Sequence, residues 1–368
     1  MRILQIAHCY YSPFLDCSRQ YAKLFEGTGY KVVTVYLTGA PNDEVAKATC
    51  SDEVIFLNYR SDQVRGLKLA AIHQIRKLVA NESFLFCIAH RSKPTYIALM
   101  ATNLPVVSVH HNHGDFDRFS RRVLVNIFKR RLLLLGVSNS VRDEMRDLFP
   151  KWPANQIETL YNRIDVEFTK AGFESKEFAR DFLGIPQESW VIGNVARLHH
   201  VKDQKTLLRG FKIALPGLPV GAVLVIMGSG PLESELKELA KNLAIEDQVI
   251  FTGNIPNGRR FFKAFDIFAF TSAREAFGMV LLEAMAADLP VVCSDSTGGA
   301  EVVEGVADFF ELGNPCDLAR VLISVSSHEF DATAMMARLN RYFSYDAARA
   351  SFFNLPFIKE KILESKLM

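Results

Sequence analysis

Short apolar runs of strand length alternate with helical patterns along most of the chain, and this alternation constrains the fold more than any other feature. In the first half, strands are expected at 2–7, 31–37, 53–57, 84–89, 105–109, 134–137 and 157–161. Helical patterns separate most of these runs. Because strands joined by helices run parallel, with the helices on the faces of the sheet, this half is expected to form a doubly wound α/β domain.

The second half repeats the same pattern. Strands are expected at 190–196, 222–227, 249–251, 267–271 and 290–293. A chain of 368 residues exceeds what a single core usually supports, so we expect two domains, at 1–167 and 168–342. Two Rossmann-like domains that face each other leave a cleft at the carboxyl ends of their strands, where ligands bind.

Composition narrows the class of protein. With 49% hydrophobic and 23% charged residues, the chain is typical of a globular protein. We find no signal-peptide pattern at the start and no apolar run of about 18 residues, so we expect a cytoplasmic protein. The six cysteines lack metal-type spacing and are expected to be reduced, structural thiols. The net charge is +2, but residues 1–167 carry 22 Lys and Arg against 16 Asp and Glu.

The segment 266–293 carries the most specific chemistry. Glu275 and Glu283 lie eight positions apart, in a predicted loop and on the helix that follows it. At about 1.5 Å per residue this separation is at most about 12 Å, which suits the two ends of a nucleotide sugar. The helix is expected to begin near Phe277 and Gly278, so its N–H groups and the positive end of its dipole would face a diphosphate.

Two cations precede this segment. Arg197 ends a predicted strand and Lys202 starts the next helix, an arrangement that could clamp a diphosphate and stabilise its departure. Taken alone, such a pair is more often solvent-facing. The Gly-x-Gly loop that begins at Gly228 is a weak signal by itself.

Together these motifs resemble the GT-B glycosyltransferases of family 4, the retaining "glycosyl transferases group 1". The resemblance covers essentially the whole chain and rests on residues 196–198 with Lys202, 227–232, 251–253, 266–272, the E-x7-E pair, and 298–303, with looser agreement at 137–142 and 160–165. It implies two Rossmann-like domains across a cleft. It also implies that a C-terminal segment, 343–368, split near Pro356, returns to the first domain.

The resemblance also implies roles for individual residues. Arg197 and Lys202 match the pair that binds the donor diphosphate, Glu283 the acid that binds the ribose, and Glu275 the acid near the sugar hydroxyls. Backbone N–H groups of the residues after Glu275 would contact sugar and phosphate, Ile255 would contact the base, and the Gly228 loop would line the donor site. The backbone residues concerned are Phe277, Gly278, Met279 and Val280.

Two positions depart from the family pattern. The segment after the first strand, 8–16, contains no glycine, although many members have a Gly-Gly loop there. The contribution of the first domain to donor binding is therefore open. Arg163 stands where the family usually has glycine, so domain closure or an acceptor contact could differ.

Histidines follow a strand of the first domain. The family commonly has a histidine near the transferred sugar at such a strand end, and His111 is the preferred match, with His110 as the alternative one residue earlier. A zinc site at His110, His111 and His113 is disfavoured by their spacing. Asp115-Phe116-Asp117 has the D-x-D form of a manganese motif, but it is interpreted as a cap for the next helix. No metal or other cofactor is expected.

A basic segment follows, expected to be one helix over 118–133. It carries six basic residues and no acid between 118 and 131: Arg118, Arg121, Arg122, Lys129, Arg130 and Arg131. Such a helix favours docking on an anionic membrane surface or a phosphorylated acceptor. The alternative is a core helix with a solvated basic edge. Nucleic acid is disfavoured, because the basic residues are confined to this patch.

The resulting hypothesis is a metal-independent, retaining transfer of a hexose from a nucleoside diphosphate to a glycan or lipid-linked acceptor. UDP-glucose is the favoured donor and GDP-mannose the second, and lipopolysaccharide core is a plausible acceptor. Two other classes stay open: a nucleotide-sugar 2-epimerase, which would need no acceptor, and a non-catalytic sugar-binding protein of two domains.

Overall fold

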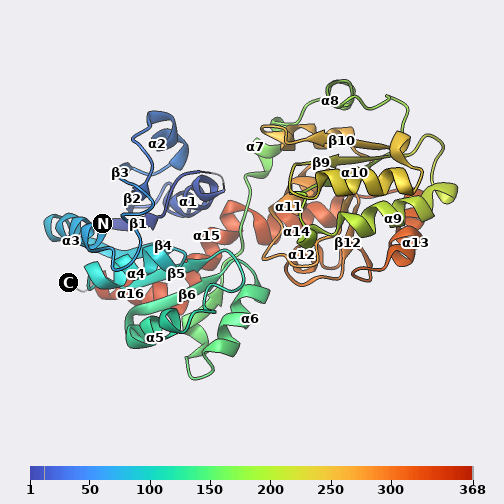
Figure 1. Cartoon of the computed structure of the whole chain (residues 1–368). Coiled ribbons are helices and arrows are strands. Elements are labelled where there is room, and N and C mark those ends of the chain that lie inside the picture. The colour runs from blue at the N-terminus through green and yellow to red at the C-terminus, as the bar shows by residue number, and fades with distance from the viewer. Residues whose placement is uncertain (12, 367–368) are drawn as a thin grey trace. The chain divides into compact units, whose positions relative to one another are not determined.

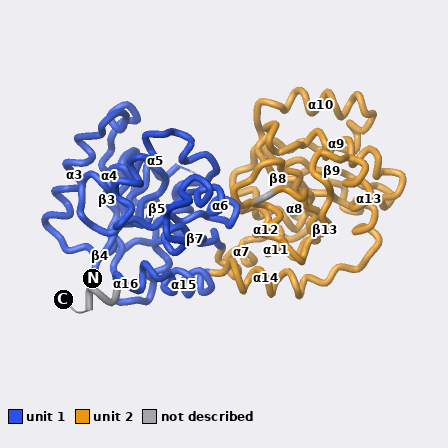
Figure 2. Tube along the Cα trace, turned by 90° about the horizontal axis from the view of Figure 1, so that it is seen from below, with its two compact units in different colours: residues 1–163, 345–368 blue, residues 164–344 orange. Residues whose placement is uncertain are grey.

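A computed structural model describes residues 1–11 and 13–366, and within it the chain forms two compact units (Figures 1 and 2). Unit 1 comprises residues 1–163 and 345–368, and unit 2 comprises residues 164–344. Each unit contains one parallel sheet with helices packed against it, so each is Rossmann-like. None of the described helices combines the length and apolarity that a membrane span requires.

Unit 1 is built on a seven-stranded sheet in the order β3-β2-β1-β4-β5-β6-β7. Its strands are β1 (Arg2–Ala7), β2 (Lys31–Thr38), β3 (Glu53–Tyr59), β4 (Phe84–His90), β5 (Val106–His110), β6 (Leu132–Gly136) and β7 (Ile157–Thr159). Its helices are α1 (Phe14–Ala22), α2 (Asp43–Thr49), α3 (Leu69–Asn81), α4 (Ser92–Ala101), α5 (Phe119–Ile127), α6 (Asn139–Leu148), α15 (Tyr345–Asn354) and α16 (Pro356–Lys366).

Unit 2 is built on a six-stranded sheet in the order β10-β9-β8-β11-β12-β13. Its strands are β8 (Val191–Val195), β9 (Val223–Met227), β10 (Val249–Gly253), β11 (Ile267–Phe270), β12 (Val291–Ser294) and β13 (Asp308–Phe310). Its helices are α7 (Val166–Ala171), α8 (Lys176–Leu183), α9 (Gln204–Ala214), α10 (Glu233–Asn242), α11 (Met279–Ala286), α12 (Thr297–Val303), α13 (Pro315–Ser326) and α14 (Thr333–Phe343).

Apolar strands explain why both sheets are buried. All five residues of β6 in the first sheet are buried, as are all five of β9 and all four of β11 in the second, as continuous apolar runs in parallel sheets require. Between the strands, polar caps fix several helix starts. Asn42, Ser138 and Asp203 each accept a hydrogen bond from a backbone N–H in the first turn of their helix.

The C-terminal segment returns to unit 1, as the family resemblance implied. It is split by Pro356 into α15 and α16. Arg349 on α15 donates to the carbonyls of Leu24 and Lys23 at 3.1 Å each, and the ring of Phe352 lies 5.6 Å from that of Phe25. These contacts attach α15 to the segment that follows α1.

Candidate active site

The carboxyl ends of β8 and β11 form the centre of the candidate donor site in unit 2. These strands are neighbours, and the chain order reverses between them, with β9 and β10 on one side and β12 and β13 on the other. Such a switch point is where open α/β sheets bind ligands. The loop after β8 carries Arg197 and Lys202, and the loop after β11 carries Glu275.

Lys202 and Glu275 are brought together across 73 positions of sequence. The ammonium of Lys202 forms an ion pair with the carboxylate of Glu275, and each side chain is 21% exposed. Two further bonds join the same loops. Thr271 Oγ1 donates to the carbonyl of Lys202, and the N–H of Ala273 donates to the carbonyl of Val201, both at 2.8 Å. The loops are therefore fixed to each other independently of the ion pair.

Arg197 differs from Lys202 in its surroundings. Its side chain is exposed, and its carbonyl accepts from Nε2 of Gln204 at 3.2 Å. The backbone of Arg197 is thus held at the end of β8 while its guanidinium extends into solvent. Such a side chain is available to an anion at the strand end.

Helix α11 presents its N-terminus to the same edge of the sheet. Gly278 precedes it with φ 91°, and no side chain among the described residues caps this end. The N–H groups of Met279 and Val280 belong to this first turn, which carries the positive end of the helix dipole. The side chain of Phe277 is instead buried, with its ring 5.7 Å from that of Phe343, so only its backbone could contact a donor. Glu283 lies one turn further along and is half-buried.

Glycines let three loops approach one another closely. A Cβ on Gly228, whose φ is +144°, would lie 2.0 Å from the carbonyl oxygen of Ala196, and one on Gly230 would lie 2.2 Å from that of Leu198. A Cβ on Gly298, at the start of α12, would lie 2.3 Å from the carbonyl oxygen of Glu275. These three glycines therefore allow the backbones of the site's loops to lie against one another.

Ile255, the residue predicted to contact the base, follows β10, the edge strand of the same sheet, and is half-buried.

In unit 1, the two histidines predicted near the reaction centre have different surroundings. His110 is buried, and its ring nitrogens lie 2.9 Å from Ser108 Oγ and 2.9 Å from Asp115 Oδ2. His111 has Nδ1 at 3.6 Å from Cys17 Sγ and Nε2 at 3.1 Å from Nδ1 of His90. Both ring nitrogens of each histidine therefore have a polar contact within the protein.

His90, at the end of β4, is a member of this cluster that the sequence did not indicate. Its ring stacks on that of His111, with centroids 5.4 Å apart. Burial, with the nearby positive charge of Arg91, lowers the pKa of His111 to about 3, and burial lowers the pKa of His90 well below its usual value. Both rings are therefore neutral near pH 7, and the hydrogen bond between them needs one donor nitrogen and one acceptor nitrogen.

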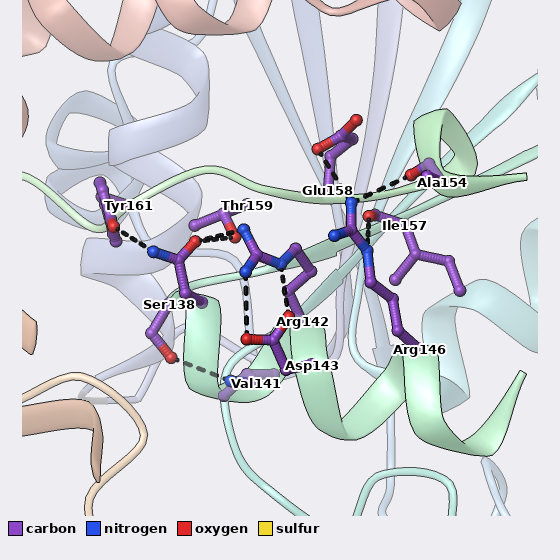
Figure 3. A network of polar contacts seen from close by, with 11 residues as sticks. Ser138, Val141, Arg142, Asp143, Arg146, Ala154, Ile157, Glu158, Thr159 and Tyr161 are labelled. Atoms are coloured by element: carbon purple, nitrogen blue, oxygen red, sulfur yellow. Dashed lines mark hydrogen bonds and ion pairs between the residues drawn. The ribbon is translucent and has the colours of Figure 1, made fainter. Parts of the chain in front are cut away.

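The motifs at 137–142 and 160–165 form one polar network in unit 1 (Figure 3). Ser138 Oγ accepts from the N–H of Val141 at 3.1 Å, and Asn139 bonds both the hydroxyl of Tyr161 and that of Thr159 at 2.8 Å. Arg142 donates to Asn139 Oδ1 at 2.6 Å and also pairs with Asp143. These contacts join the start of α6 to the chain after β7.

Arg163, the residue in the family's glycine position, is only 1% exposed and lies inside unit 1. Its guanidinium donates to the carbonyls of Gln20 and Tyr161, and it lies 4.7 Å from the ring centroid of Tyr21 and 5.9 Å from that of Tyr345. Arg163 therefore links α1 and α15 to the segment that follows β7.

One residue of the other departure from the family pattern, the glycine-free segment 8–16, lies outside the described residues, namely Ser12.

The basic segment is not the single helix that we predicted. Helix α5 ends at Ile127, because Phe128 leaves the helical conformation (φ −100°, ψ 12°), and a 3-10 turn at Lys129–Arg131 follows. Arg121 donates to the carbonyl of Asp115 at 2.7 Å, and Arg131 donates to that of Leu104 at 2.8 Å. These two cations are used inside the fold, whereas Arg118, Lys129 and Arg130 are exposed and Arg122 is half-buried.

The Asp115-Phe116-Asp117 tripeptide does not cap α5 either. The helix is preceded by Arg118, and no side chain caps it. Asp115 pairs with His110, and Phe116 is buried against that ring at 4.6 Å. Within residues 1–11 and 13–366, no three His, Cys, Asp or Glu side chains are arranged to hold a metal ion. Metal independence of the reaction stays a prediction.

Comparison with known protein families gives matches over both units. Residues 175–342 match the model described as "Glycosyl transferases group 1", and residues 18–168 match "Glycosyltransferase Family 4". Among curated relatives, a Campylobacter jejuni N-acetylgalactosamine-N,N'-diacetylbacillosaminyl-diphospho-undecaprenol 4-alpha-N-acetylgalactosaminyltransferase is 30% identical over 64% of this chain and 63% of its own. The lipopolysaccharide core biosynthesis mannosyltransferase LpsB of Rhizobium meliloti is 28% identical over 48% of this chain and 52% of its own. The matched parts thus span less than two thirds of these relatives.

Solved structures match over nearly the full length. Anabaena HepE in complex with UDP and glucose superposes with a TM-score of 0.77 at 18% identity, covering 99% of this chain and 100% of that one. The apo form of the lipopolysaccharide outer core galactosyltransferase WaaB gives a TM-score of 0.73 at 16% identity, covering 98% and 100%. At these identities the similarity establishes a shared fold.

Proposed function

The chain belongs to family 4 of the GT-B glycosyltransferases, and from this membership we propose that it transfers a hexose from a nucleoside-diphosphate sugar to a hydroxyl of a glycan or lipid-linked acceptor, with retention of configuration. One observation carries the proposal for this chain. Lys202 and Glu275 meet at the switch point of unit 2, beside Arg197 and the N-terminus of α11.

In the proposed reaction, the bond between the anomeric carbon and the diphosphate breaks, and the nucleoside diphosphate leaves with the electron pair. Arg197, Lys202 and the N–H groups of Met279 and Val280 stabilise its growing negative charge. The acceptor oxygen then bonds to the anomeric carbon on the same face, and its proton passes to the departing phosphate oxygen. Glu275 orients the sugar, Glu283 binds the ribose, and no metal takes part.

UDP-glucose is the donor that we favour, and GDP-mannose is the second. HepE, one of the structural neighbours, has been solved with UDP and with UDP-glucose, whereas LpsB is a mannosyltransferase. The test incubates the protein with a panel of nucleotide sugars in the presence of EDTA and measures release of the nucleoside diphosphate. We expect slow release from one nucleotide sugar without acceptor, and faster release with acceptor. Conversion of the nucleotide sugar to its epimer without release, or no cleavage in the whole panel, would contradict the proposal.

A membrane-bound acceptor is supported by the outer face of α5. Phe119, Val123 and Ile127 recur every fourth residue and are 72%, 40% and 68% exposed. Exposed basic side chains flank this apolar stripe, namely those of Arg118, Lys129 and Arg130. An amphipathic helix with basic flanks binds anionic lipid surfaces, with about 1 kcal/mol from each basic residue near the surface. We therefore propose that the protein docks on the inner face of the cytoplasmic membrane and acts on a lipid-linked glycan such as lipopolysaccharide core.

Vesicle sedimentation tests this placement. The wild type should sediment with anionic vesicles more than with neutral ones, and Phe119→Ser with Ile127→Ser should lower the bound fraction. Phe178→Ser with Phe182→Ser is the matched control, since these two phenylalanines lie four residues apart on α8 of unit 2 and are 51% and 57% exposed. Equal sedimentation of the wild type and the α5 variant would contradict docking through this helix.

A further inference from the structure

Unit 1 contains a second strand end with an unusual backbone, at the start of α4. Arg91 joins β4 to α4 with φ 68° and ψ 173°, a region that is essentially restricted to glycine. The same residue is the N-cap of the ten-residue helix, and no side chain of the described residues caps this end. Because β4 is the neighbour of β1 at the point where the order of the first sheet reverses, Arg91 lies at the switch point of unit 1.

The segment before α3 lies against the first turns of α4. The ammonium of Lys68 lies 4.5 Å from the ring centroid of Tyr96, whose hydroxyl donates to the carbonyl of Leu67 at 3.3 Å. Tyr96 is one turn after Lys93 on the same helix. These contacts bring Lys68, with Arg65 three residues earlier, to the end of α4 that carries Arg91 and Lys93.

None of these four cations pairs with a carboxylate of the described residues. Arg91 contacts uncharged groups, namely the side-chain amide of Asn112 and the ring of Phe14, whose centroid lies 5.5 Å away. Lys68 donates to the carbonyl of Gly66 at 2.6 Å. Burial and then the charge of Arg65 lower the pKa of Lys93, and burial and then the charge of Lys93 lower that of Lys68. Arg65 and Lys93 thus repel each other, as do Lys93 and Lys68, and no carboxylate among the described residues pairs with either lysine or with Arg65.

His8 contributes a further polar atom at this edge. It follows β1, the strand next to β4, and its Nδ1 is buried without a hydrogen-bond partner in the described part of the chain. Burial, followed by the charges of Lys93 and Arg91, lowers the pKa of His8 to about 4. A neutral His8 can donate one hydrogen bond without a proton being taken up. A buried polar atom without a partner is destabilising unless a ligand satisfies it.

We propose that Arg65, Lys68, Arg91 and Lys93, together with the N-terminus of α4, bind a phosphate or diphosphate group of the acceptor. Anions bind at helix N-termini, and four cations that pair with no carboxylate of the described residues suit a group that carries two or more negative charges. This inference rests on the proposed transfer and specifies its acceptor as a phosphorylated molecule. The donor diphosphate has separate candidate ligands in unit 2, namely Arg197, Lys202 and the N-terminus of α11.

Calorimetric titration with inorganic pyrophosphate, in the presence of saturating UDP, tests the site. UDP occupies the donor ligands of unit 2, so we expect one pyrophosphate to bind per chain in unit 1. The double variant Lys68→Gln with Lys93→Gln should bind it at least tenfold more weakly. The control variant Lys47→Gln with Lys77→Gln removes the same charge from exposed positions of unit 1 and should bind it as the wild type does.

Three results would overturn the site: no pyrophosphate binding by the wild type, loss of binding when UDP is saturating, or equal weakening in the control variant. Loss on saturation with UDP would assign the cations to the donor diphosphate. Release of nucleoside diphosphate from nucleotide sugars by the wild type tests the transferase proposal separately. A protein that binds pyrophosphate as expected and cleaves no nucleotide sugar would retain the phosphate site and disprove the proposed reaction.

Discussion

Removing Glu275 should affect donor binding and turnover in opposite ways, because its carboxylate is paired with Lys202. Two unit charges about 4 Å apart attract each other by about 4 kcal/mol at an effective dielectric constant of about 20. Desolvation and side-chain entropy oppose this attraction. For two side chains that are each 21% exposed, we expect a net coupling of about 1 to 2 kcal/mol.

The expected effects on UDP affinity follow from this coupling. Lys202→Gln removes a charge-assisted hydrogen bond to the diphosphate, worth about 1.5 to 3 kcal/mol, and should weaken UDP binding about 10- to 150-fold. Glu275→Gln releases the ammonium from its carboxylate, so UDP should bind equally well or up to about 30-fold more tightly. Turnover of the nucleotide sugar should nevertheless fall in Glu275→Gln, since the sugar loses the group that orients it.

Titration calorimetry with UDP on the wild type, both single variants and the double variant measures the coupling directly. Lys241→Gln and Glu238→Gln are matched controls, because both residues are exposed on α10 or at its end and should not change UDP affinity. In the double variant, UDP should bind as it does to Lys202→Gln. If Glu275→Gln weakened UDP binding as strongly as Lys202→Gln, with additive losses in the double variant, Glu275 would itself support the diphosphate and the proposed division of roles would be wrong.

Two further predictions concern the stability of each unit. Gly228→Ala should lower the free energy of unfolding of unit 2 by about 2 to 4 kcal/mol, since its Cβ would lie 2.0 Å from the carbonyl oxygen of Ala196. Urea unfolding measures this loss. The control is Gly29→Ala, whose Cβ meets nothing within 4 Å. The free energy of unfolding of unit 1 should also fall as the pH decreases from about 6.5 towards 4. The reason is that His90 and His111 take up protons in the unfolded chain but stay neutral in the folded one. Each histidine should lower the free energy of unfolding by about 1.4 kcal/mol per pH unit. His111→Asn should reduce this slope in urea unfolding at pH 7, 6 and 5, and an unchanged slope would contradict the assignment.

The sequence allowed the fold class to be predicted for a physical reason, whereas the roles of the donor-site residues came from the family resemblance and stay predictions. Parallel strands are buried on both faces, so they appear as continuous apolar runs, and β8, β9 and β11 are clear examples. The E-x7-E pair lies on one loop and one helix, so its spacing is local. By contrast, the ion pair of Lys202 with Glu275 joins residues 73 positions apart, and the family pattern predicted a shared ligand rather than this contact.

The features that the sequence did not reveal depend on remote backbone or side-chain partners. Periodicity indicates that Arg121 and Arg131 belong to a basic segment, but the carbonyls that accept their hydrogen bonds come from Asp115 and Leu104. The contact between His111 and Cys17 joins residues 94 positions apart, and neither residue belongs to a spaced motif that would indicate it. The exposed apolar stripe on α5 could not be predicted either, because the sequence does not show which face of the helix packs against the rest of unit 1.

The two departures from the family pattern meet at α1. This helix begins within the glycine-free segment 8–16, and Cys17 on it contacts His111. Its last turn is held by Arg163, which donates through its guanidinium to the carbonyl of Gln20 and through its backbone N–H to Gln20 Oε1 at 3.1 Å. A glycine at position 163 has no side chain for the guanidinium bonds or for the contact with Tyr21. The position of α1 is therefore fixed by contacts in its middle, at Cys17, and in its last turn, at Gln20 and Tyr21. We expect a substitution at Arg163 to shift the helix and so to alter the contact between Cys17 and His111.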